Sequence, residues 1–230
     1  MIFLPSIAFV DGLKFPLSDL PIPRRKKRHL ARGEYEIPER NLIKRFVKPG
    51  MKVLELGASL GIVSTFIARQ IGPDGTLISV EADASLATHW HHNLNINGYT
   101  GKCIHALACP IWSVQIPDSI LCQSFTPNSD KLSGRIKKSD VACARTAWKT
   151  CSEVCSDHQF FPDALIIDIE GTEIVWTEVS AIFPSHIKLT IVEFHPQYTG
   201  PEKAAQCVQS LIDQGFRVIG YQNHVMAFAR

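Results

Sequence analysis

Apolar residues follow two patterns that alternate along most of the chain. Short, nearly continuous apolar runs predict buried strands at residues 52–57, 76–81, 102–109, 163–170 and 187–195. Between these runs, apolar residues recur every three or four positions and predict helices at residues 37–47, 60–72, 84–97, 172–183 and 201–215. Residues 216–230 are typical of a hairpin. Strands that alternate with helices predict an α/β fold with a parallel sheet, to which the hairpin adds an antiparallel strand.

The pattern weakens between residues 110 and 162. The elements predicted there are short strands at 113–117, 120–125 and 135–145 and a short helix at 147–155. A chain of 230 residues accommodates one domain with an insertion. We therefore expect an N-terminal segment at residues 1–33, an α/β domain at residues 34–230, and an insertion within that domain at residues 110–162.

Charge is spread unevenly over a chain that is nearly neutral overall. The formal net charge of +2 does not by itself indicate a nucleic-acid partner. One short run holds six of the 24 basic residues, which leaves 18 against 22 acidic residues elsewhere, or −4; the run contains Arg24, Arg25, Lys26, Lys27, Arg28 and Arg32. We expect a solvated N-terminal arm, and the alternatives are a phosphate-binding segment or a nuclear address.

The cysteines and the apolar N-terminus indicate the compartment. Seven cysteines, an odd number without a CxxC pair, favour buried thiols in a reducing compartment and disfavour a zinc site, so we expect a cytoplasmic protein. The apolar residues at the N-terminus are interrupted by Pro5 and end at Asp11. They are too few to span a bilayer, and we expect a strand or a docking segment and no membrane span.

The sequence VLELGASLGIVS, residues 53–64, predicts a strand that turns tightly into a helix. Gly57-x3-Gly61 is not the GxGxxG pattern of dinucleotide-binding folds, and the GK[ST] of a P-loop is absent. Glu55 at the end of the strand suits a ligand with a positive end and would repel a pyrophosphate. Glu81, at the end of the next strand, is placed to accept hydrogen bonds from ribose hydroxyls. An adenosine ligand with a positive end is S-adenosylmethionine (SAM), which carries an ammonium and a sulfonium.

Further acidic residues follow the two later strands. Asp168 and Glu170 lie two residues apart in IIDIEGTE, and Glu193 and His195 have the same spacing in IVEFHP. Residues two apart in a strand point to the same side, and strand ends of a parallel sheet meet at one edge, so we expect these four side chains to line one cleft. Glu173 is interpreted as a first-turn helix acid. The histidines of HWHH, residues 89–92, are interpreted as surface residues without a metal.

The ordered set LELGASLGIVS, SVEAD, IIDIEGTE and IVEFHP resembles the FkbM family of SAM-dependent methyltransferases over residues 34–196. The resemblance implies a Rossmann-like class I methyltransferase sandwich, with a seven-stranded, mostly parallel sheet and an antiparallel C-terminal strand. It implies methyl transfer from SAM to a hydroxyl of a small molecule such as a sugar or secondary metabolite, with S-adenosylhomocysteine as the product. The cofactor-binding residues it implies are Glu55, Gly57, Ala58, Ser59, Gly61, Ser64, Glu81, Ala82 and Asp168. The catalytic residues are His195, Glu170, Asp168 and Glu193, and the insertion at 110–162 is expected to cover the acceptor site.

Two mechanisms can remove the proton of an acceptor hydroxyl. His195 is the favoured base, because its ordinary pKa is nearest neutrality and carboxylates could orient it. The disfavoured alternative is Mg²⁺ held by Asp168, Glu170 and Glu193, which would lower the pKa of a bound hydroxyl.

Three other functions would make different demands on the sequence. An RNA ribose or cap methyltransferase would use the basic residues Arg24 to Arg28, and a non-catalytic SAM-binding module would need the acids dispersed. A nucleobase amine methylase is disfavoured, because DIEG stands where a [DNS]PP[YFW] loop would be required.

Overall fold

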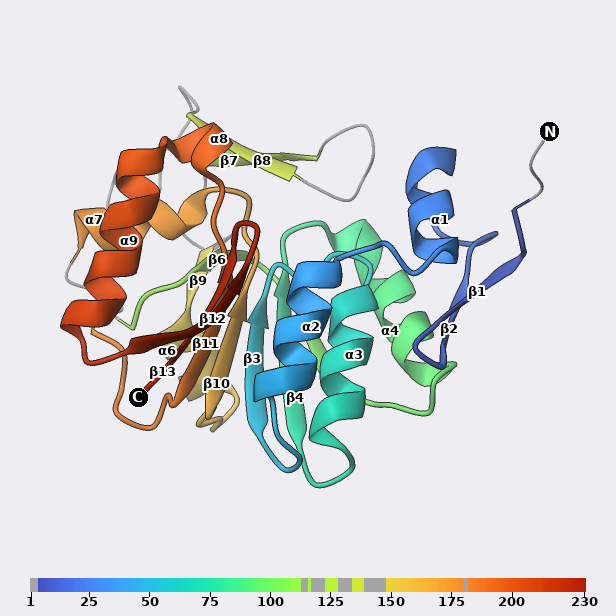
Figure 1. The fold of residues 1–230 in the computed structure, drawn as a ribbon, viewed down its shortest axis with the longest axis horizontal. Helices are drawn as coiled ribbons and strands as arrows, with labels where there is room; N and C mark the ends of the chain where they lie inside the picture. The colour runs from blue at the N-terminus through green and yellow to red at the C-terminus, as the bar shows by residue number, and fades with distance from the viewer. Residues whose placement is uncertain (1–3, 113–115, 117–122, 128–133, 139–147, 180–181) are drawn as a thin grey trace.

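In a computed structural model, seven strands form one twisted sheet at the centre of the molecule (Figure 1). The structure describes residues 4–112, 116, 123–127, 134–138, 148–179 and 182–230. The strand order is β12-β13-β11-β10-β3-β4-β5, and β13 runs antiparallel to both of its neighbours. The strands are β3 (Lys52–Leu56), β4 (Thr76–Glu81), β5 (Lys102–His105), β10 (Ala164–Ile167), β11 (Leu189–Glu193), β12 (Arg217–Gln222) and β13 (Val225–Ala229). The predicted α/β fold, with its seven-stranded, mostly parallel sheet, is confirmed.

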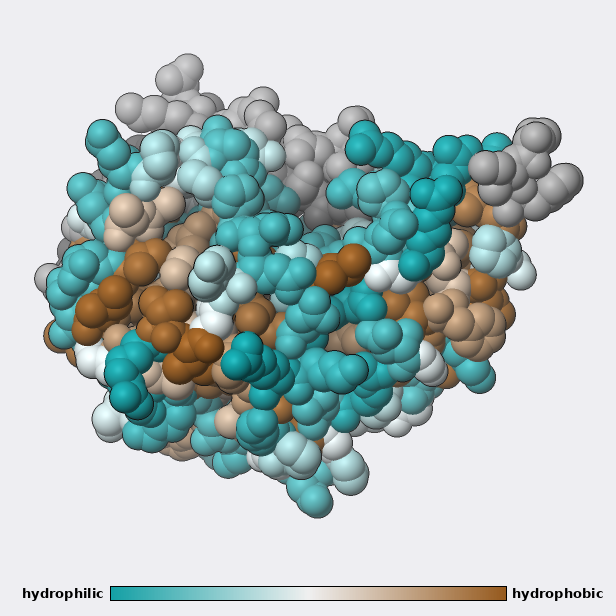
Figure 2. Space-filling view, in the orientation of Figure 1, coloured by the Kyte–Doolittle hydropathy of each residue, from teal (hydrophilic) through white to brown (hydrophobic). Residues whose placement is uncertain are grey.

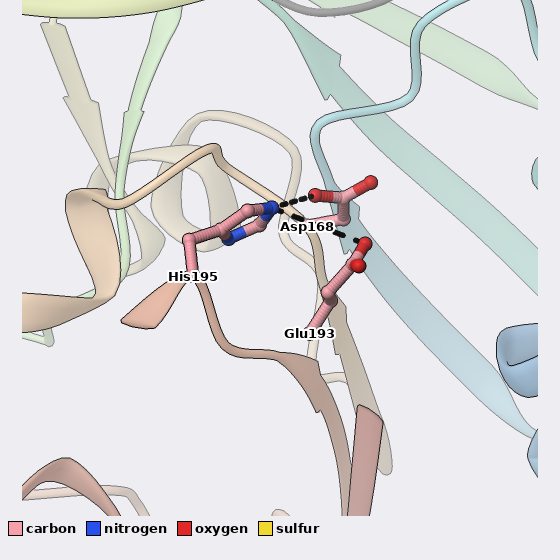
Figure 3. A group of neighbouring side chains, drawn as sticks. All are labelled: Asp168, Glu193 and His195. Atoms are coloured by element: carbon pink, nitrogen blue, oxygen red, sulfur yellow. Dashed lines mark ion pairs between the residues drawn. The ribbon is translucent and has the colours of Figure 1, made fainter. Parts of the chain in front are cut away.

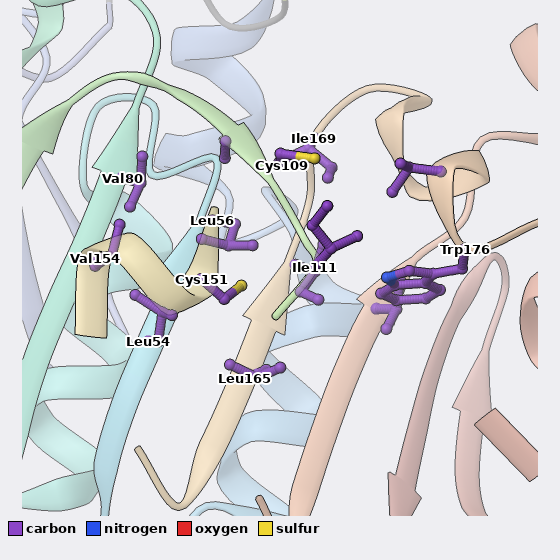
Figure 4. Close-up of a cluster of buried hydrophobic side chains, with 14 of the residues drawn as sticks. Leu54, Leu56, Val80, Cys109, Ile111, Cys151, Val154, Leu165, Ile169 and Trp176 are labelled. Carbon is purple, nitrogen blue, oxygen red and sulfur yellow. The ribbon is translucent and has the colours of Figure 1, made fainter. Parts of the chain in front are cut away.

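Both faces of this sheet are buried, which is why its central strands are nearly continuous apolar runs. Successive residues alternate between two cores: Val53 and Ile166 pack in one, and Leu54 and Leu165 pack in the other. The first core contains side chains of α2 (Ile37–Phe46), α3 (Ile62–Ile71) and α4 (Ala87–Asn95). The second, part of which Figure 4 shows, contains side chains of α6 (Cys151–Asp157), α7 (Val175–Glu178) and α9 (Pro201–Asp213).

The N-terminal segment is folded rather than an extended arm. Strands β1 (Ile7–Val10) and β2 (Leu13–Pro16) form a hairpin, and the basic residues lie on a helix, α1 (Arg24–Ala31). Leu30 of α1 is fully buried in a third apolar cluster, which joins the hairpin to Phe66 of α3. Figure 2 shows a hydrophilic surface over α1, so the expected solvation is found, but on a helix that Leu30 anchors.

The region of residues 107–157 departs from the predicted elements in two places. The predicted strand 102–109 divides into β5, which stays in the large sheet, and β6 (Leu107–Cys109), which pairs instead with β9 (Trp148–Thr150). The predicted helix 147–155 begins only at α6, where Thr150 and Glu153 form a reciprocal capping box. A second pair joins β7 (Gln123–Pro127) to β8 (Gly134–Lys138). The end of the predicted strand 135–145 lies outside the described residues, as does the predicted strand 113–117 except for Ile116, which is buried and has no strand pairing.

Several helices are short. The predicted helix 84–97 begins as a 3-10 turn, η1 (Ala84–Leu86), which Asp83 caps by accepting from the Ser85 N–H at 2.9 Å. The predicted helix 172–183 consists of η3 (Thr172–Ile174) followed by α7, and α8 (Pro196–Thr199) precedes α9. Among the described residues, no helix has the length and apolarity that crossing a bilayer requires.

Candidate functional site

A cavity of about 400 Å³ lies where β3, β10 and β11 end. The turn between β3 and α3 forms one wall, and the segments after β10 and β11 form another. This is the edge of a parallel sheet at which ligands of open α/β folds bind. The lining residues are Lys26, Tyr35, Glu36, Gly57, Ala58, Ser59, Leu60, Ile62, Val63, Asp168, Glu170, Glu193, His195, Gln197 and Tyr198.

The two glycines of the turn are required by the fold itself. Gly57 has φ +88°, and a Cβ there would lie 1.6 Å from the backbone oxygen of Asp168. Gly61 has φ +75°, and a Cβ there would lie within 2.9 Å of Trp90 on α4. Both positions are therefore closed to a side chain by protein atoms, whether or not a ligand is bound.

Glu55 does not line the main cavity. Its side chain is buried, and Oε2 accepts hydrogen bonds from Ser64 at 2.6 Å and Ser79 at 2.5 Å. The Ser64 hydroxyl in turn accepts from the Trp90 indole at 2.8 Å. Burial raises the pKa of Glu55 to about 7, against the opposing effect of the two serines. The structure thus brings Glu55 and Ser64 together, but behind the cavity wall, and their contact with SAM stays a prediction.

Glu81 organises the glycine turn from the neighbouring strand. Its two carboxylate oxygens accept from the backbone N–H of Ser59 and of Asp83, each at 2.7 Å. Burial raises the pKa of Glu81, and these hydrogen bonds oppose the rise. Each carboxylate oxygen has a second lone pair, so a ribose contact beside Ala82 stays compatible with this geometry and stays a prediction.

The four predicted catalytic side chains do converge, and Figure 3 shows three of them, Asp168, Glu193 and His195. His195 Nε2 lies 3.5 Å from Asp168 Oδ1, 3.6 Å from Glu170 Oε2 and 4.0 Å from Glu193 Oε2. His195 is 5% exposed, whereas Asp168 is 35% exposed and faces the cavity. The predicted convergence is found, but in the segments just past β10 and β11 rather than on one face of each strand, since only Glu193 lies within a strand.

Glu173 lies in the first turn of η3, as expected, but it is also part of this cluster, which the sequence did not predict. It is 2% exposed, and its Oε1 accepts a hydrogen bond from His195 Nδ1 at 2.8 Å. Burial lowers the pKa of His195, but the hydrogen bond and charge of Glu173, with the charges of Glu193 and Glu170, outweigh it and raise the pKa overall. Glu173 also fixes which ring nitrogen faces the cavity, because Nδ1 is occupied.

The acids of the cavity raise one another's pKa values. For Asp168, burial comes first and the charge of Glu193 second, and the pKa is raised well above its usual range. For Glu193, burial raises the pKa to about 7, although His195 opposes the rise. Carboxyl groups held in this way favour a positively charged partner.

Sequence reasoning missed the acids at the start of α2. Glu36 lines the same cavity, and the buried Glu39 beside it has its pKa raised to about 9, mainly by burial and then by Glu36. Three non-glycine residues with left-handed backbone line this cavity: Glu36 (φ 47°), Ser59 (φ 48°) and Glu170 (φ 52°). Such strain gathers at functional sites, but it is not visible in the sequence.

The residues present fit the positive end of SAM. Asp168 Oδ1 is buried without a hydrogen-bond partner among the described residues, and it faces a cavity whose walls carry four carboxyl groups. Two groups of side chains are also spaced to hold a metal ion: Asp168, Glu193 and His195, and Glu36, Glu39 and Glu193.

Comparisons with known sequences match the part of the chain that contains the glycine turn. The family model for protein-L-isoaspartate(D-aspartate) O-methyltransferase (PCMT) matches residues 39–111. A protein-L-isoaspartate O-methyltransferase of Methanopyrus kandleri is 42% identical over 52 residues, which are 23% of this chain and 23% of that relative. The matched part of the chain runs from α2 to just past β6 and ends before Asp168.

Comparisons with solved structures cover more of the chain. A candidate SAM-dependent methyltransferase from Streptococcus mutans aligns over 99% of this chain and 56% of its own, with a TM-score of 0.53 and 10% identity. Fibrillarin of Aeropyrum pernix, in complex with natively bound SAM, aligns over 83% of this chain and 73% of its own, with a TM-score of 0.46 and 13% identity. The alignment with the S. mutans structure supports the Rossmann-like fold, and the match to the methyltransferase family model supports a SAM-dependent methyltransferase.

Proposed function

We propose that this protein transfers a methyl group from SAM to a hydroxyl oxygen of a small molecule, in the manner of the FkbM family. The observation that carries the proposal is one cavity with two unlike walls. The glycine turn forms the first wall, and the second places Asp168, Glu170, Glu193 and His195 opposite it.

The first wall and Asp168 are assigned to the cofactor. Gly57, Ala58, Ser59 and Gly61 would hold the methionine part, Asp168 would meet its positive charge, and Glu81 would accept from the ribose. When bound, SAM supplies a methyl group on a sulfonium sulfur. The lone pair of the acceptor oxygen forms the new C–O bond, the C–S bond breaks with its electron pair on sulfur, and the hydroxyl proton leaves to a base or to water.

The second wall favours a hydroxyl over a carboxylate as the acceptor. A carboxylate such as that of an isoaspartyl residue would enter beside Glu36, Glu170 and Glu193 and be repelled, since like charges disfavour one another at short range. A hydroxyl is neutral and is not repelled by these acids. It must lose its proton as it attacks, and the side chains of this wall can help to remove that proton. The sequence match to isoaspartate methyltransferases lies outside this wall, because it ends at residue 111.

Two measurements test the proposal. Calorimetry should show binding of SAM and S-adenosylhomocysteine but not of NAD. Methyl transfer from radiolabelled SAM should then be screened over sugars, phenols, capped RNA and an isoaspartyl peptide, with each labelled product treated with mild alkali. An ether survives alkali, whereas a methyl ester releases methanol. Alkali-stable label on a small hydroxyl compound is the expected result, and label that is lost to alkali would establish a carboxylate acceptor instead.

A further inference from the structure

The ring nitrogen of His195 that faces the cavity, Nε2, has no hydrogen-bond partner among the described residues. His195 is 5% exposed, and its Nε2 has three carboxylate oxygens at 3.5, 3.6 and 4.0 Å. Hydrogen bonds between nitrogen and oxygen span about 2.7–3.2 Å, so all three distances are too long. Asp168 Oδ1, the nearest of these oxygens, is also buried without a hydrogen-bond partner among the described residues. Figure 3 shows the side chains aimed at this common point.

The spacing of the ligand atoms matches that around a small divalent ion. One ligand atom each from Asp168, Glu193 and His195 lies within 4.8 Å of the other two. An octahedral ion with bonds of about 2.1 Å holds adjacent ligands roughly 3.0 Å apart and opposite ligands about 4.2 Å apart. The measured 3.5 and 4.0 Å from Nε2 fall between these values. Small movements of the side chains would therefore bring these three atoms to the spacing of octahedral ligands.

The other nitrogen of the ring is held as in metal-binding histidines. Ligating histidines usually donate their second N–H to a carboxylate, which fixes the tautomer and raises the basicity of the ligand. Here Nδ1 donates to Glu173 Oε1 at 2.8 Å, and Glu173 is itself buried. A buried acid in this position is costly unless it serves such a partner.

We propose that Asp168 Oδ1, Glu193 and His195 bind a divalent cation of the Mn²⁺ or Mg²⁺ class, which leaves the second carboxylate oxygen of Asp168 for the cofactor. Two carboxylates and one imidazole suit such an ion, and Glu170 is close enough to contribute a further oxygen. The ion's part in the reaction rests on the proposed function: it would lower the pKa of the acceptor hydroxyl, whose proton would then leave to water. His195 is in this case a ligand, in place of the free base expected from the sequence.

Mn²⁺ binding to chelator-treated protein without SAM tests the site apart from any activity. We expect one Mn²⁺ per chain by titration monitored with electron paramagnetic resonance, and electron spin-echo modulation from an imidazole nitrogen. Glu193→Gln should abolish this binding, and Glu173→Gln should weaken it by roughly 10- to 100-fold, as for changes to the partner of a ligating histidine. Glu202→Gln, at an exposed acid in the first turn of α9, is the matched control and should leave binding unchanged.

Absence of Mn²⁺ binding by folded wild-type protein that still binds S-adenosylhomocysteine would overturn the site and leave the acids to the cofactor's ammonium. Binding that survives Glu193→Gln, with melting temperature unchanged, would overturn the ligand assignment. Full methyl transfer in chelator, with loss of activity in His195→Ala, would restore His195 as the base. Failure of S-adenosylhomocysteine to bind would instead refute the proposed function. The Mn²⁺ titration would still show whether the metal site exists, because it is carried out without SAM.

Discussion

Replacing Glu55 by Gln should remove a pH dependence from the stability of the fold. The carboxyl group of Glu55 is 2% exposed, and burial raises its pKa from about 4.5 to about 7. The folded state therefore holds this proton more tightly than the unfolded state does. Its stabilising effect is complete below about pH 4.5 and is lost as the pH rises through about 7, because the unfolded chain releases the proton first.

The size of the effect follows from the difference between the two pKa values. A difference of about 2.5 pH units (7 − 4.5) at about 1.4 kcal/mol each amounts to roughly 3 kcal/mol. Gln keeps the shape and can still accept from Ser64 and Ser79, but it cannot ionise. Relative to wild type, Glu55→Gln should thus gain about 3 kcal/mol of unfolding free energy between pH 4.5 and pH 8.

Urea unfolding monitored by tryptophan fluorescence, at pH steps from 4.5 to 8, measures both proteins. The other buried acids are present in both and cancel in the difference. Glu202→Gln, at an exposed position, should give a curve parallel to wild type. Parallel curves for Glu55→Gln as well would refute the reasoning and show that Glu55 is already ionised within its serine pair.

Three further changes test other parts of the structure. Glu81→Ala should weaken SAM binding about 10- to 100-fold by calorimetry, since charge-assisted hydrogen bonds contribute roughly 1.5–3 kcal/mol; unchanged affinity would place the ribose elsewhere. Gly61→Ala should lower unfolding free energy by more than about 1 kcal/mol in urea, because its Cβ would meet Trp90 and its φ is +75°; an unaffected midpoint would contradict this packing. Neutralising Arg24, Arg25, Lys27 and Arg28, but not Lys26, which lines the cavity, should leave turnover on a small acceptor unchanged, whereas loss of tight, salt-dependent RNA binding would favour the RNA alternative.

The domain boundaries predicted from the sequence are also open to test. Replacing residues 110–162 by a short linker should spare SAM binding and abolish turnover if this segment covers the acceptor. Because β9 and α6 pack Trp148 and Cys151 into the core, the variant's melting curve must be measured beside its binding. Turnover retained by a folded variant would place the acceptor site elsewhere.

The sheet could be predicted because its strands are buried on both faces, and long apolar runs bounded by glycine or proline are distinctive. Where a strand ends depends on where the neighbouring strand stops pairing with it, and the sequence of the strand itself does not show this. The run at residues 102–109 is apolar throughout its second half, yet β4 ends at Glu81, opposite His105. Beyond that pair only the Ala106 N–H still reaches β4, at the Glu81 carbonyl, and Leu107 pairs with Trp148 instead.

The site was predicted where it depends on spacing and missed where it depends on distant contacts. The sequence placed Asp168, Glu170, Glu193 and His195 at the ends of neighbouring strands, and they do meet there, although Asp168, Glu170 and His195 lie just past those ends and Glu170 has left-handed backbone. Glu173 has its partner 22 residues later in the chain, so its sequence neighbours suggest only a helix start. Leu30 anchors α1 through contacts with the hairpin and α3, and a run of basic residues does not reveal them.

Register decides which strand-end acids face a ligand. Glu55 is still paired within the sheet, opposite Ile166 on one side and Ser79 on the other, so its side chain lies on a sheet face. There it is buried by α3 through Ser64. Asp168 lies one residue beyond Ile167, the last paired residue of β10, and lines the cavity. Glu55, one residue before the last pair of its strand, is therefore buried in the core, and its ionisation affects the stability of the fold. Asp168, one residue after the last pair of its strand, lines the cavity and can meet a charged ligand.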